Sequence, residues 1–540
     1  MRSEPIPLDK LPGLPQLTRN YLCDFDRVAA LFDAPPSLNR SWSESADGNR
    51  RQRVNPAALA EILEDQNRSL GAPARSLANV RLLAQEETLA VVTGQQVGYL
   101  GGAAYTLHKA LTAVRLAEHI ARTTGRPCVP VFYLVSEDHD LDEIRHAHIL
   151  GEAHELIRLS LELSATQRPA FQVSLPETCA EHLEILRKRL PETPFRDELL
   201  GALSATYQPG ETLPRAFARW MLTLLQDAGL VILDASDGRL KRLASRLFLW
   251  EIEEGSASTR ALIQVNRELE ARGYQPQIQV RGGRFNLFFL ERGRHAVHEE
   301  GPEVAVPSLG RRWSKREFQA MIEENPECLS PNVVLRPLFQ DLLLPTVAYV
   351  AGPAEIAYFA QLSAVYRSFG LQMPVIWPRA TFTLLTPPVQ RYLDRLGLEP
   401  AQVVAGNRVH QLLTTRDEEL AEIHEHVAQL AHWVTEGWGP LHRAIVSLDG
   451  SLDGYLRKTL THMLHSLQEV EAKAAQAKRR KDQDLARQLQ AIENTIRPLG
   501  KLQERVLSPL SFLVRTGPEL PRLLLEQISL DSFEHRICYL

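Results

Sequence analysis

The chain has 540 residues, of which 44% are hydrophobic and 24% are charged. These values exclude a disordered chain and are typical of a globular protein with a large core, and the length allows about three structural units. Lys and Arg number 61 against 66 Asp and Glu, so a net charge of −5 leaves no positive excess for a general nucleic-acid binder.

The sequence gives no sign of a membrane segment or of a disulfide framework. The first residues contain no apolar stretch of signal-peptide length, and no later run approaches the roughly 20 apolar residues that cross a bilayer. We therefore expect a cytoplasmic protein that binds neither a membrane nor nucleic acid. The five cysteines are scattered and include no Cys-x-x-Cys pair, so we expect buried thiols.

The first 130 residues contain the clearest predicted elements. Residues 1–80 hold helical stretches broken by Pro and Gly, with a polar connection over 40–55. The apolar run 89–93 predicts a strand that ends in a glycine-rich loop, 94–102. Apolar residues then recur every three or four positions up to Gly125, which predicts a helix.

A second buried strand is predicted over 128–135, and it ends in an acidic loop that begins at Ser136. Strand, helix and strand form a βαβ unit, whose right-handed crossover makes the two strands parallel. Because the carboxyl ends of parallel strands lie at one edge of the sheet, the loops at Gly94 and Ser136 should face the same crevice, where ligands of open α/β sheets bind.

The α/β pattern continues more loosely. We expect a helix over about 214–228, a third parallel strand over 230–234 and two short hairpins over 277–298 that make an antiparallel insertion. A strand over 346–351 precedes a helix that Gly352-Pro353 opens and Gly370 closes, and another strand covers 374–377.

From Asp417 onward the composition is helical. A first coiled-coil seam has the spacing of four and three at Leu456, Leu460, Met463, Leu467, Val470, Ala474 and Ala477. A second seam, at Leu485, Leu489, Ile492, Ile496 and Leu499, starts out of register with the first. This shift favours a hairpin bent near 478–484 over one straight helix, with a first arm about 35 Å long that could grip another subunit.

The loop after the second strand carries the most reactive group of residues. Five carboxylates and an imidazole lie within seven positions: Glu137, Asp138, His139, Asp140, Asp142 and Glu143. Like charges this close repel, so a cation, a cationic substrate or bound protons should neutralise them. His139 could act as a general base oriented by Asp138 or Asp140, and Mg²⁺ would suit the oxygen ligands. A solvated loop or helix cap is the alternative.

The glycine-rich loop could bind an anion. Its backbone N–H groups would lie at the start of the following helix, where the dipole favours negative charge. The loop matches neither G-x-G-x-x-G nor the Walker pattern, so a packing turn is the alternative. His108 and Lys109 lie in the first turns of that helix. A positive Lys109 opposes the dipole, which favours an anionic ligand, with a solvent-facing Lys109 as the alternative.

Two later pairs are also candidates. If residues 332–336 are extended, Asn332 and Arg336 point to the same side, and Arg336 could bind a carboxylate or form a structural ion pair. Glu355 and Tyr358 are three apart near the start of a helix and share a face that could meet a ligand.

Five ordered blocks of this sequence resemble the cysteine ligase family of bacillithiol biosynthesis, the cysteine-adding enzymes. The blocks are Thr93-Gly-Gln-Gln96, Tyr105-Thr-Leu-His-Lys109, Ser136-Glu-Asp-His-Asp140 with Asp142-Glu-Ile144, Asn332-Val-Val-Leu-Arg-Pro337 and Ala351-Gly-Pro-Ala-Glu-Ile-Ala-Tyr358. The resemblance extends over essentially the whole chain, although the family often has Gly-Pro where this chain has Gly102-Ala103.

The resemblance implies an α/β fold: a Rossmann-like parallel-sheet core with inserted connecting segments, similar in plan to class I aminoacyl-tRNA synthetases, and a C-terminal coiled coil that makes a homodimer. We divide the chain into a helical N-terminal segment packed on the core (1–80), the catalytic core (81–380) with insertions at about 150–215 and 255–330, a helical region (381–510) with a hairpin at about 440–508, and a C-terminal segment (511–540) that returns to the core.

The resemblance also implies the last step of the pathway, in which cysteine is joined by an amide bond to glucosaminyl malate. Activation of the cysteine carboxylate requires an energy source, so we expect ATP or ADP as a ligand, with Mg²⁺ as its companion. The metal-binding residues stay unknown. In our hypothesis, His108 and Lys109 stabilise the charge of the phosphates, and Asp138 and Asp140 hold the metal or the cysteine ammonium group. His139 acts as the base that deprotonates the attacking amine, and Arg336 binds the malyl carboxylates.

The remaining expected substrate-binding residues are Gly94, Gln95, Gln96, Tyr105, Glu137, Asn332, Glu355 and Tyr358. Two other classes of function stay open at this point. One is a nucleotidyl-transfer enzyme that acts on another small molecule, and the other is a non-catalytic assembly protein built around the coiled coil.

Overall fold

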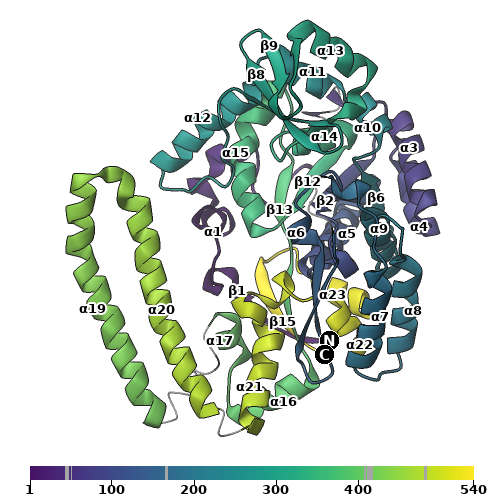
Figure 1. Cartoon of the computed structure of the whole chain (residues 1–540). Helices are drawn as coiled ribbons and strands as arrows, with labels where there is room; N and C mark the ends of the chain where they lie inside the picture. Colours follow the sequence, from purple (N-terminus) through teal and green to yellow (C-terminus); the bar gives the residue numbers. More distant parts are fainter. Residues whose placement is uncertain (43–47, 50–51, 164–167, 407–408, 410–417, 480–482) are drawn as a thin grey trace. The chain divides into compact units, whose positions relative to one another are not determined.

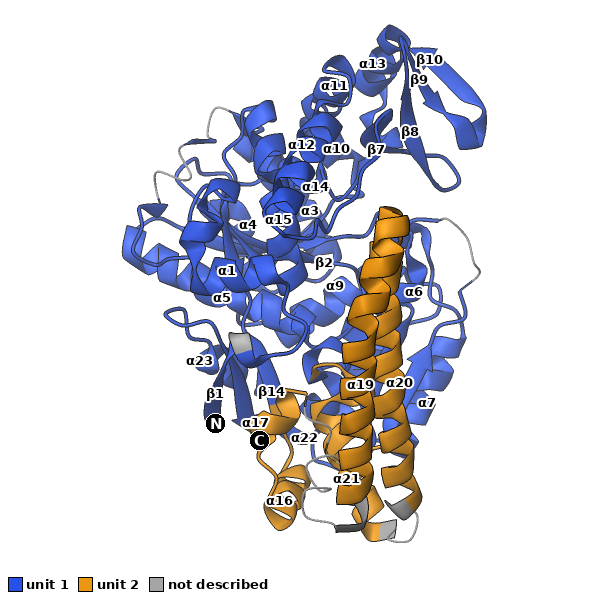
Figure 2. Cartoon of the chain, turned by 90° about the vertical axis from the view of Figure 1, so that its left-hand side faces the viewer, with its two compact units in different colours: residues 1–152, 156–383, 503–538 blue, residues 153–155, 384–502, 539–540 orange. Residues whose placement is uncertain are grey.

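The structure is a computed structural model of the chain, and it describes residues 1–42, 48–49, 52–163, 168–406, 409, 418–479 and 483–540 (Figure 1). The chain forms two units (Figure 2). Unit 1 contains residues 1–152, 156–383 and 503–538, and unit 2 contains residues 153–155, 384–502 and 539–540. Among the helices of the described residues, none is long and apolar enough to span a membrane.

The centre of unit 1 is a five-stranded parallel sheet with the order β13-β12-β2-β3-β6. Its strands are β2 (Leu89–Gln95), β3 (Cys128–Leu134), β6 (Val231–Asp234), β12 (Thr346–Ala351) and β13 (Val375–Pro378). These segments are apolar and almost completely buried, as expected for parallel strands that are covered on both faces. The five strands predicted from the sequence and their parallel arrangement are confirmed.

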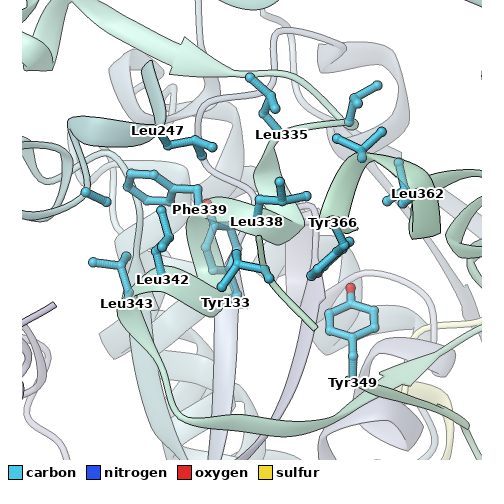
Figure 3. Packing of buried hydrophobic residues seen from close by; sticks show 14 of the residues in the cluster. Tyr133, Leu247, Leu335, Leu338, Phe339, Leu342, Leu343, Tyr349, Leu362 and Tyr366 are labelled. Carbon is cyan, nitrogen blue, oxygen red and sulfur yellow. The ribbon is translucent and has the colours of Figure 1, made fainter. Parts of the chain in front are cut away.

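Helices link these strands and supply much of the core. They include α5 (Tyr105–Thr124), which Gly125 ends with a φ of 70°, α9 (Leu213–Leu224), α14 (Arg336–Leu343) and α15 (Pro353–Phe369). Figure 3 shows Leu338, Phe339 and Leu342 of α14 in the buried cluster that also contains Tyr133 and Tyr349 of the sheet. Burial of each such side chain stabilises the fold by about 1.5–3 kcal/mol, so the elements that carry the site are firmly held.

An antiparallel sheet is inserted between β6 and β12, with the order β10-β9-β8-β7-β11. Its strands are β7 (Arg284–Leu290), β8 (Arg294–Glu300), β9 (Glu303–Val306), β10 (Arg311–Ser314) and β11 (Leu329–Pro331). The predicted insertion is confirmed, but it is larger than two short hairpins over 277–298. Only the β7–β8 hairpin corresponds to that range, because the strands after it have only three or four residues each and give a weak alternation signal.

The N-terminal segment packs on this core as predicted, since Tyr21, Leu63 and Val80 belong to the same buried cluster. It contains β1 (Arg2–Pro7), α1 (Gln16–Cys23), α3 (Pro56–Ser69) and α4 (Ala74–Leu82), and part of its polar connection lies outside the described residues. The strand β1 was not predicted, and it pairs within the sheet β1-β15-β14. All five cysteines are free, but Cys23 is exposed, which corrects the expectation that all are buried.

The remaining elements of unit 1 lie in connections and near the C-terminus, and the last residues of β14 and β15 belong to unit 2. They are α6 (Leu141–Ile144), β4 (His146–Leu150), β5 (Leu156–Ser160), α7 (Thr178–Arg189), α8 (Arg196–Thr206), α10 (Gly238–Leu243), α11 (Arg246–Glu253), α12 (Ala257–Ala271), α13 (Lys315–Glu324), β14 (Thr381–Leu385), α22 (Leu510–Thr516), α23 (Leu520–Gln527) and β15 (Glu534–Tyr539).

Unit 2 contains a long helical hairpin, α19 (Glu418–Leu448) and α20 (Asp453–Arg479), whose helices lie side by side (Figures 1 and 2). It also contains α16 (Pro387–Leu396), α17 (Pro400–Val404) and α21 (Gln483–Ile496). This hairpin is not the predicted one: α20 packs along α19 through a turn at Gly450–Leu452, whereas the bend was predicted near 478–484, of which residues 480–482 lie outside the described residues. A heptad seam identifies an interacting face and not the helix that covers it.

Candidate active site

The predicted convergence of the two loops is confirmed. A cavity of about 650 Å³ opens in unit 1 at the carboxyl ends of β2, β3 and β12. Its lining includes Gly94, Gln95, Gln96, Tyr133, Glu137, Asp138, Glu143, Phe288, Arg294, Pro331, Asn332, Val333, Arg336, Tyr349, Glu355 and Tyr358. The parallel sheet and the inserted antiparallel sheet therefore both contribute walls to one cavity.

A direct hydrogen bond joins the two loops. The Gln96 side chain donates from Nε2 to Asp138 Oδ2 over 2.7 Å, and the backbone N–H of His139 donates to Asp138 Oδ1 over 2.8 Å. Asp138 is 27% exposed at its side chain and is held in place by both loops. It can therefore present a fixed negative charge to a ligand in the cavity.

Two carboxylates of the acidic loop are paired with the protein's own cations, a route that the sequence did not indicate. Lys241 of α10 is buried and places its Nζ 2.5 Å from Glu137 Oε1. On the other side of the loop, Arg145 contacts Asp142 over 2.9 Å. The crowding of carboxylates is thus no evidence for a bound cation by itself.

His139 and Asp140 are not among the residues that line the cavity. The His139 ring is 38% exposed, its Nδ1 lies 3.7 Å from Asp138 Oδ1, and its centroid lies 6.2 Å from that of Phe288. Asp140 is exposed at the start of α6, where its backbone N–H lies 3.4 Å from Asp138 Oδ1. The structure therefore keeps His139 beside the site and places Asp140 outside it.

The glycine-rich turn after Gln96 is a packing turn, which corrects the predicted anion site. Gly98 N–H donates to Gln96 O, Gly101 N–H to the Tyr207 hydroxyl and Gly102 N–H to Tyr99 O. These N–H groups already have partners inside the protein, so they do not fit a phosphate. A Cβ on Gly98 would lie 2.6 Å from Gly102 Cα, which explains the need for glycine there.

Lys109 is buried, so the solvent-facing alternative is wrong, and its positive charge is explained without a ligand. Its Nζ lies 2.5 Å from Glu355 Oε2 and donates to Gly94 O over 2.8 Å and to Gln95 Oε1 over 3.0 Å. Burial lowers the pKa of Lys109, and Glu355 opposes that shift. Lys109 therefore ties the first loop to α15 at the back of the cavity.

His108 does not line the cavity, which contradicts its predicted contact with phosphate. The side chain is buried, and Nδ1 lies 3.0 Å from Glu504 Oε2. Burial lowers the pKa of His108. A neutral imidazole can donate its Nδ1 hydrogen to the Glu504 carboxylate, and Arg379 supplies the balancing positive charge over 2.6 Å.

Tyr105 lies beside the cavity rather than in its lining. Its hydroxyl accepts a hydrogen bond from Gln95 Nε2 over 3.1 Å, and burial raises its pKa. The Arg379 guanidinium lies 5.6 Å from the ring centroid. Tyr105 therefore supports Gln95, which does line the cavity, instead of meeting a ligand directly.

The segment that leads into α14 is a turn, which corrects the extended conformation expected over 332–336. Asn332 Oδ1 accepts from the Val334 N–H over 2.9 Å, and the Arg336 N–H donates to Asn332 O over 2.8 Å. An Asn side chain that satisfies N–H groups two residues ahead is typical of such turns. Asn332 and Arg336 nevertheless line the same cavity.

Arg336 is buried at the cavity without an acidic partner. Its guanidinium donates to the Tyr358 hydroxyl over 3.1 Å and lies 5.4 Å from the Tyr133 centroid. Among the described residues, no carboxylate oxygen forms an ion pair with it within 4.0 Å, and Glu355 acts on it electrostatically only from a greater distance, so a close structural ion pair is not supported. Burial raises the pKa of Tyr358 to about 12, so its hydroxyl stays protonated.

Glu355 and Tyr358 share a face of α15 as predicted, and both line the cavity. Glu355 accepts hydrogen bonds from the Tyr349 hydroxyl over 3.0 Å and from the Gly352 N–H over 2.7 Å. With Lys109 as a third partner, Glu355 is well satisfied by the protein. Its role in ligand binding stays a prediction.

Sequence reasoning missed three contributors to the site: Arg294, Phe288 and Lys241. The first two are neighbours on the β7–β8 hairpin, and the third lies on α10. None of them belongs to a recognisable motif. Their sequence offered one indication only, the predicted hairpin in a polar insertion. A metal centre is not evident either, because the described residues include no cluster of three or more His, Cys, Asp or Glu that could hold an ion.

Comparisons with known proteins agree along the whole chain. A family model described as bacillithiol biosynthesis BshC, N-terminal Rossmann-like domain, matches residues 1–380, and one described as the C-terminal coiled-coil domain of BshC matches residues 382–540.

Three relatives carry the name "putative cysteine ligase BshC". The protein from Salinibacter ruber is 34% identical, with 98% of this chain and 96% of the relative covered. The protein from Symbiobacterium thermophilum is 33% identical, with coverage of 96% and 97%, and that from Solibacter usitatus is 31% identical, with coverage of 98% and 98%.

Proposed function

We propose, for a chain that belongs to the bacillithiol biosynthesis BshC family, that the cavity of unit 1 is the active site of a ligase that joins cysteine to glucosaminyl malate. The bond formed is an amide between the cysteine carboxylate and the amine of the sugar, in the last step of bacillithiol formation. The product carries a free thiol.

The observation that carries this proposal is the separation of charge within one cavity. Asp138 and Glu143 offer carboxylates on the side of the acidic loop, while Arg336 offers a buried guanidinium on the side of α14. A substrate pair that brings an ammonium group and carboxylates to the same site matches this distribution. Neutral substrates would leave Arg336 buried with neutral partners only.

Amide formation from a free carboxylate requires activation, and we propose that ATP supplies it. The N–H groups of Gly98, Gly101 and Gly102 and the His108 side chain do not fit phosphate, so the proposal of ATP rests on the chemistry of the bond. Mg²⁺ would accompany the nucleotide, because this ion is commonly bound through one or two carboxylates and the phosphates.

The chain's own residues have separate tasks in this proposal. Asp138, held by Gln96, binds and orients the ammonium group of a substrate. His139 accepts the proton that the attacking amine loses, and its Nδ1 lies close enough to Asp138 for the resulting imidazolium to be stabilised. Arg336 binds a carboxylate of the acceptor.

The test is turnover by the purified protein with cysteine, glucosaminyl malate and ATP under reducing conditions, with the thiol product measured by mass spectrometry. We expect product that depends on all three compounds, and a loss of at least about a hundredfold in Asp138→Asn. The matched control is Asp142→Asn, since Asp142 is 81% exposed and lies outside the cavity. Absence of product from the folded wild-type protein would reject the proposal.

We also propose that the hairpin of unit 2 makes a homodimer. Large apolar side chains are exposed along one stripe of each helix, at Leu430, Trp433, Leu441 and Leu448 of α19 and at Tyr455, Met463 and Val470 of α20. Spacings of three, seven and eight place each set on one face of its helix. Leu456 lies seven positions before Met463 on this same face and is buried, so the face is covered near the start of α20 and exposed farther along the helix.

The dimer is tested by light scattering on the full chain. We expect a mass near twice that of the chain for the wild type and a monomer for the double substitution Met463→Asp and Val470→Asp, with unchanged circular dichroism. The control is His465→Asp, because His465 is exposed and lies off this stripe. A monomeric wild type would refute this part of the proposal.

A further inference from the structure

The inserted sheet brings a second arginine, Arg294, to the cavity. Its side chain is only 10% exposed, and its guanidinium lies 4.1 Å from the centroid of the Phe288 ring. One terminal nitrogen donates to Pro331 O over 2.9 Å. The ring and the carbonyl hold the guanidinium in one orientation at the cavity wall.

The positive charge of Arg294 has no close ion pair of its own: Glu137 and Asp138 both act on it electrostatically, but Glu137 is already paired with Lys241. The nearest carboxylate oxygen is Asp138 Oδ1 at 3.5 Å, and this oxygen already accepts the shorter bond from the His139 N–H. Asp138 Oδ2 is occupied by Gln96. The Arg294 Nε is buried and has no hydrogen-bond partner within the described structure. A single long contact lacks the two parallel bonds of a strong arginine–carboxylate pair.

Arg294 and Arg336 line the same cavity and have Tyr133 as a common neighbour. Arg336 is bonded to neutral groups, and Arg294 shares the Asp138 carboxylate with three other donors: Gln96 Nε2 and the backbone N–H groups of His139 and Asp140. Burial of two such cations costs free energy that an anionic ligand can offset. Two guanidiniums that line one cavity match two carboxylates better than one.

We propose that Arg294 is a specificity-determining residue that binds one carboxylate of a dicarboxylate acceptor while Arg336 binds the other. The identity of the acceptor rests on the proposed function above, whereas the binding of a dicarboxylate does not. The insertion thus selects the acceptor, and the parallel sheet presents the groups that react. Phe288 packs on the guanidinium and so restrains it beside the cavity.

Calorimetric titration of the full-length protein with malate, and with its uncharged diamide, tests the proposal without turnover. We expect malate to bind the wild type and the diamide to bind at least about tenfold more weakly. Arg294→Met should weaken malate binding about ten- to a hundredfold. Arg294→Lys should retain part of it, because an ammonium group is a point charge that cannot bond bidentately.

The matched control is Arg311→Met. Arg311 belongs to the same sheet and lies 5.8 Å from the ring of Phe289, but its side chain is 44% exposed and it pairs with Glu291. Malate binding should be unchanged in this variant. If Arg294→Met does not fold, the same test is made with Arg294→Lys. The ratio of its affinities for malate and for the diamide should be lower than in the wild type.

Turnover separates this proposal from the function itself. Arg294→Met should raise KM for glucosaminyl malate by about tenfold or more. KM for cysteine should stay within about twofold of the wild-type value. A ligase whose malate affinity survives Arg294→Met, or a wild type that does not bind malate, overturns the role of Arg294. Malate binding that depends on Arg294 in a protein without ligase activity would instead reject the proposed function.

Discussion

Two arginines of unit 1 are almost equally buried and have opposite surroundings. Arg379 is 7% exposed and places its guanidinium 2.6 Å from Glu504, which also bonds His108 and the Phe382 N–H. Arg336 is 8% exposed and bonds neutral oxygens at the cavity wall. The first charge is balanced inside the chain and stabilises the fold, whereas the second is left for a ligand.

Substitution of Glu504 should have the largest effect, because it breaks the balanced cluster. Glu504→Ala leaves the Arg379 guanidinium buried without its counter-ion, and removal of one partner of a buried pair costs about 3–5 kcal/mol. Urea unfolding should show this loss in the free energy of unfolding. A loss below about 1 kcal/mol would mean that the cluster is not the stabilising element described here.

A third buried ionisable group, the Glu251 carboxyl of α11, extends the comparison because it has no cationic partner among the described residues and does not line the cavity. Its oxygens accept hydrogen bonds from the Ser258 hydroxyl and the Asn286 N–H, and no basic nitrogen of the described chain lies within 4.0 Å. Burial, with a smaller contribution from Glu299, raises the pKa of Glu251 to about 7 from its ordinary value of 4.5.

This raised pKa predicts a pH dependence with a definite sign. Between pH 4.5 and about 7 the folded state keeps a proton on Glu251 that the unfolded state has lost. Stability should therefore fall as the pH rises through this window, by about 3 kcal/mol in total, and this contribution should be absent above pH 7. The difference in unfolding free energy between wild type and Glu251→Gln, measured across the window, isolates the effect; a flat difference contradicts it.

Arg336→Met should have the smallest effect on stability and a clear effect on activity. Loss of a charge-assisted contact to the acceptor should raise the activation free energy by about 2 kcal/mol, which lowers kcat/KM about thirtyfold. The free energy of unfolding should change by less than about 1 kcal/mol, because the buried guanidinium has no counter-ion to lose. If this variant is strongly destabilised while kcat/KM of its folded fraction is unchanged, Arg336 stabilises the fold and does not bind the acceptor.

The sequence predicted the position of the cavity because that position follows from local rules. Apolar runs followed by Gly94 and Ser136 identified two strands, and the handedness of the βαβ crossover then placed both loops at one edge. Asn332, Arg336, Glu355 and Asp138 were identified because polar residues at the ends of buried strands and helices are conspicuous.

The partners of these residues could not be predicted, because they come from remote parts of the chain. Gly101 donates to Tyr207 across 106 positions, and His108 meets Glu504 across 396 positions. These two contacts convert an apparent phosphate site into a packing turn and a buried cluster. Arg294 was missed for the same reason, since its place at the cavity depends on how an inserted sheet folds back.

The pairing of the helical hairpin shows a similar limit. The heptad spacing of α20 correctly indicated a helix with an interacting face. It could not distinguish α19 from α21 as the partner, nor show that the seam is covered over only part of its length, since Leu456 is buried while Val470 is 58% exposed. Spacing alone shows where apolar residues lie on a helix, but it does not show which other helix covers them.

A crystal structure of the protein soaked with cysteine and glucosaminyl malate would test the central claim most directly, namely that the loops at Gly94 and Ser136 line one substrate cavity. We predict that the malyl carboxylates contact Arg336 and that an amino group lies within hydrogen-bond distance of Asp138. Both substrates bound elsewhere on the molecule, with this cavity filled only by water, would contradict the account.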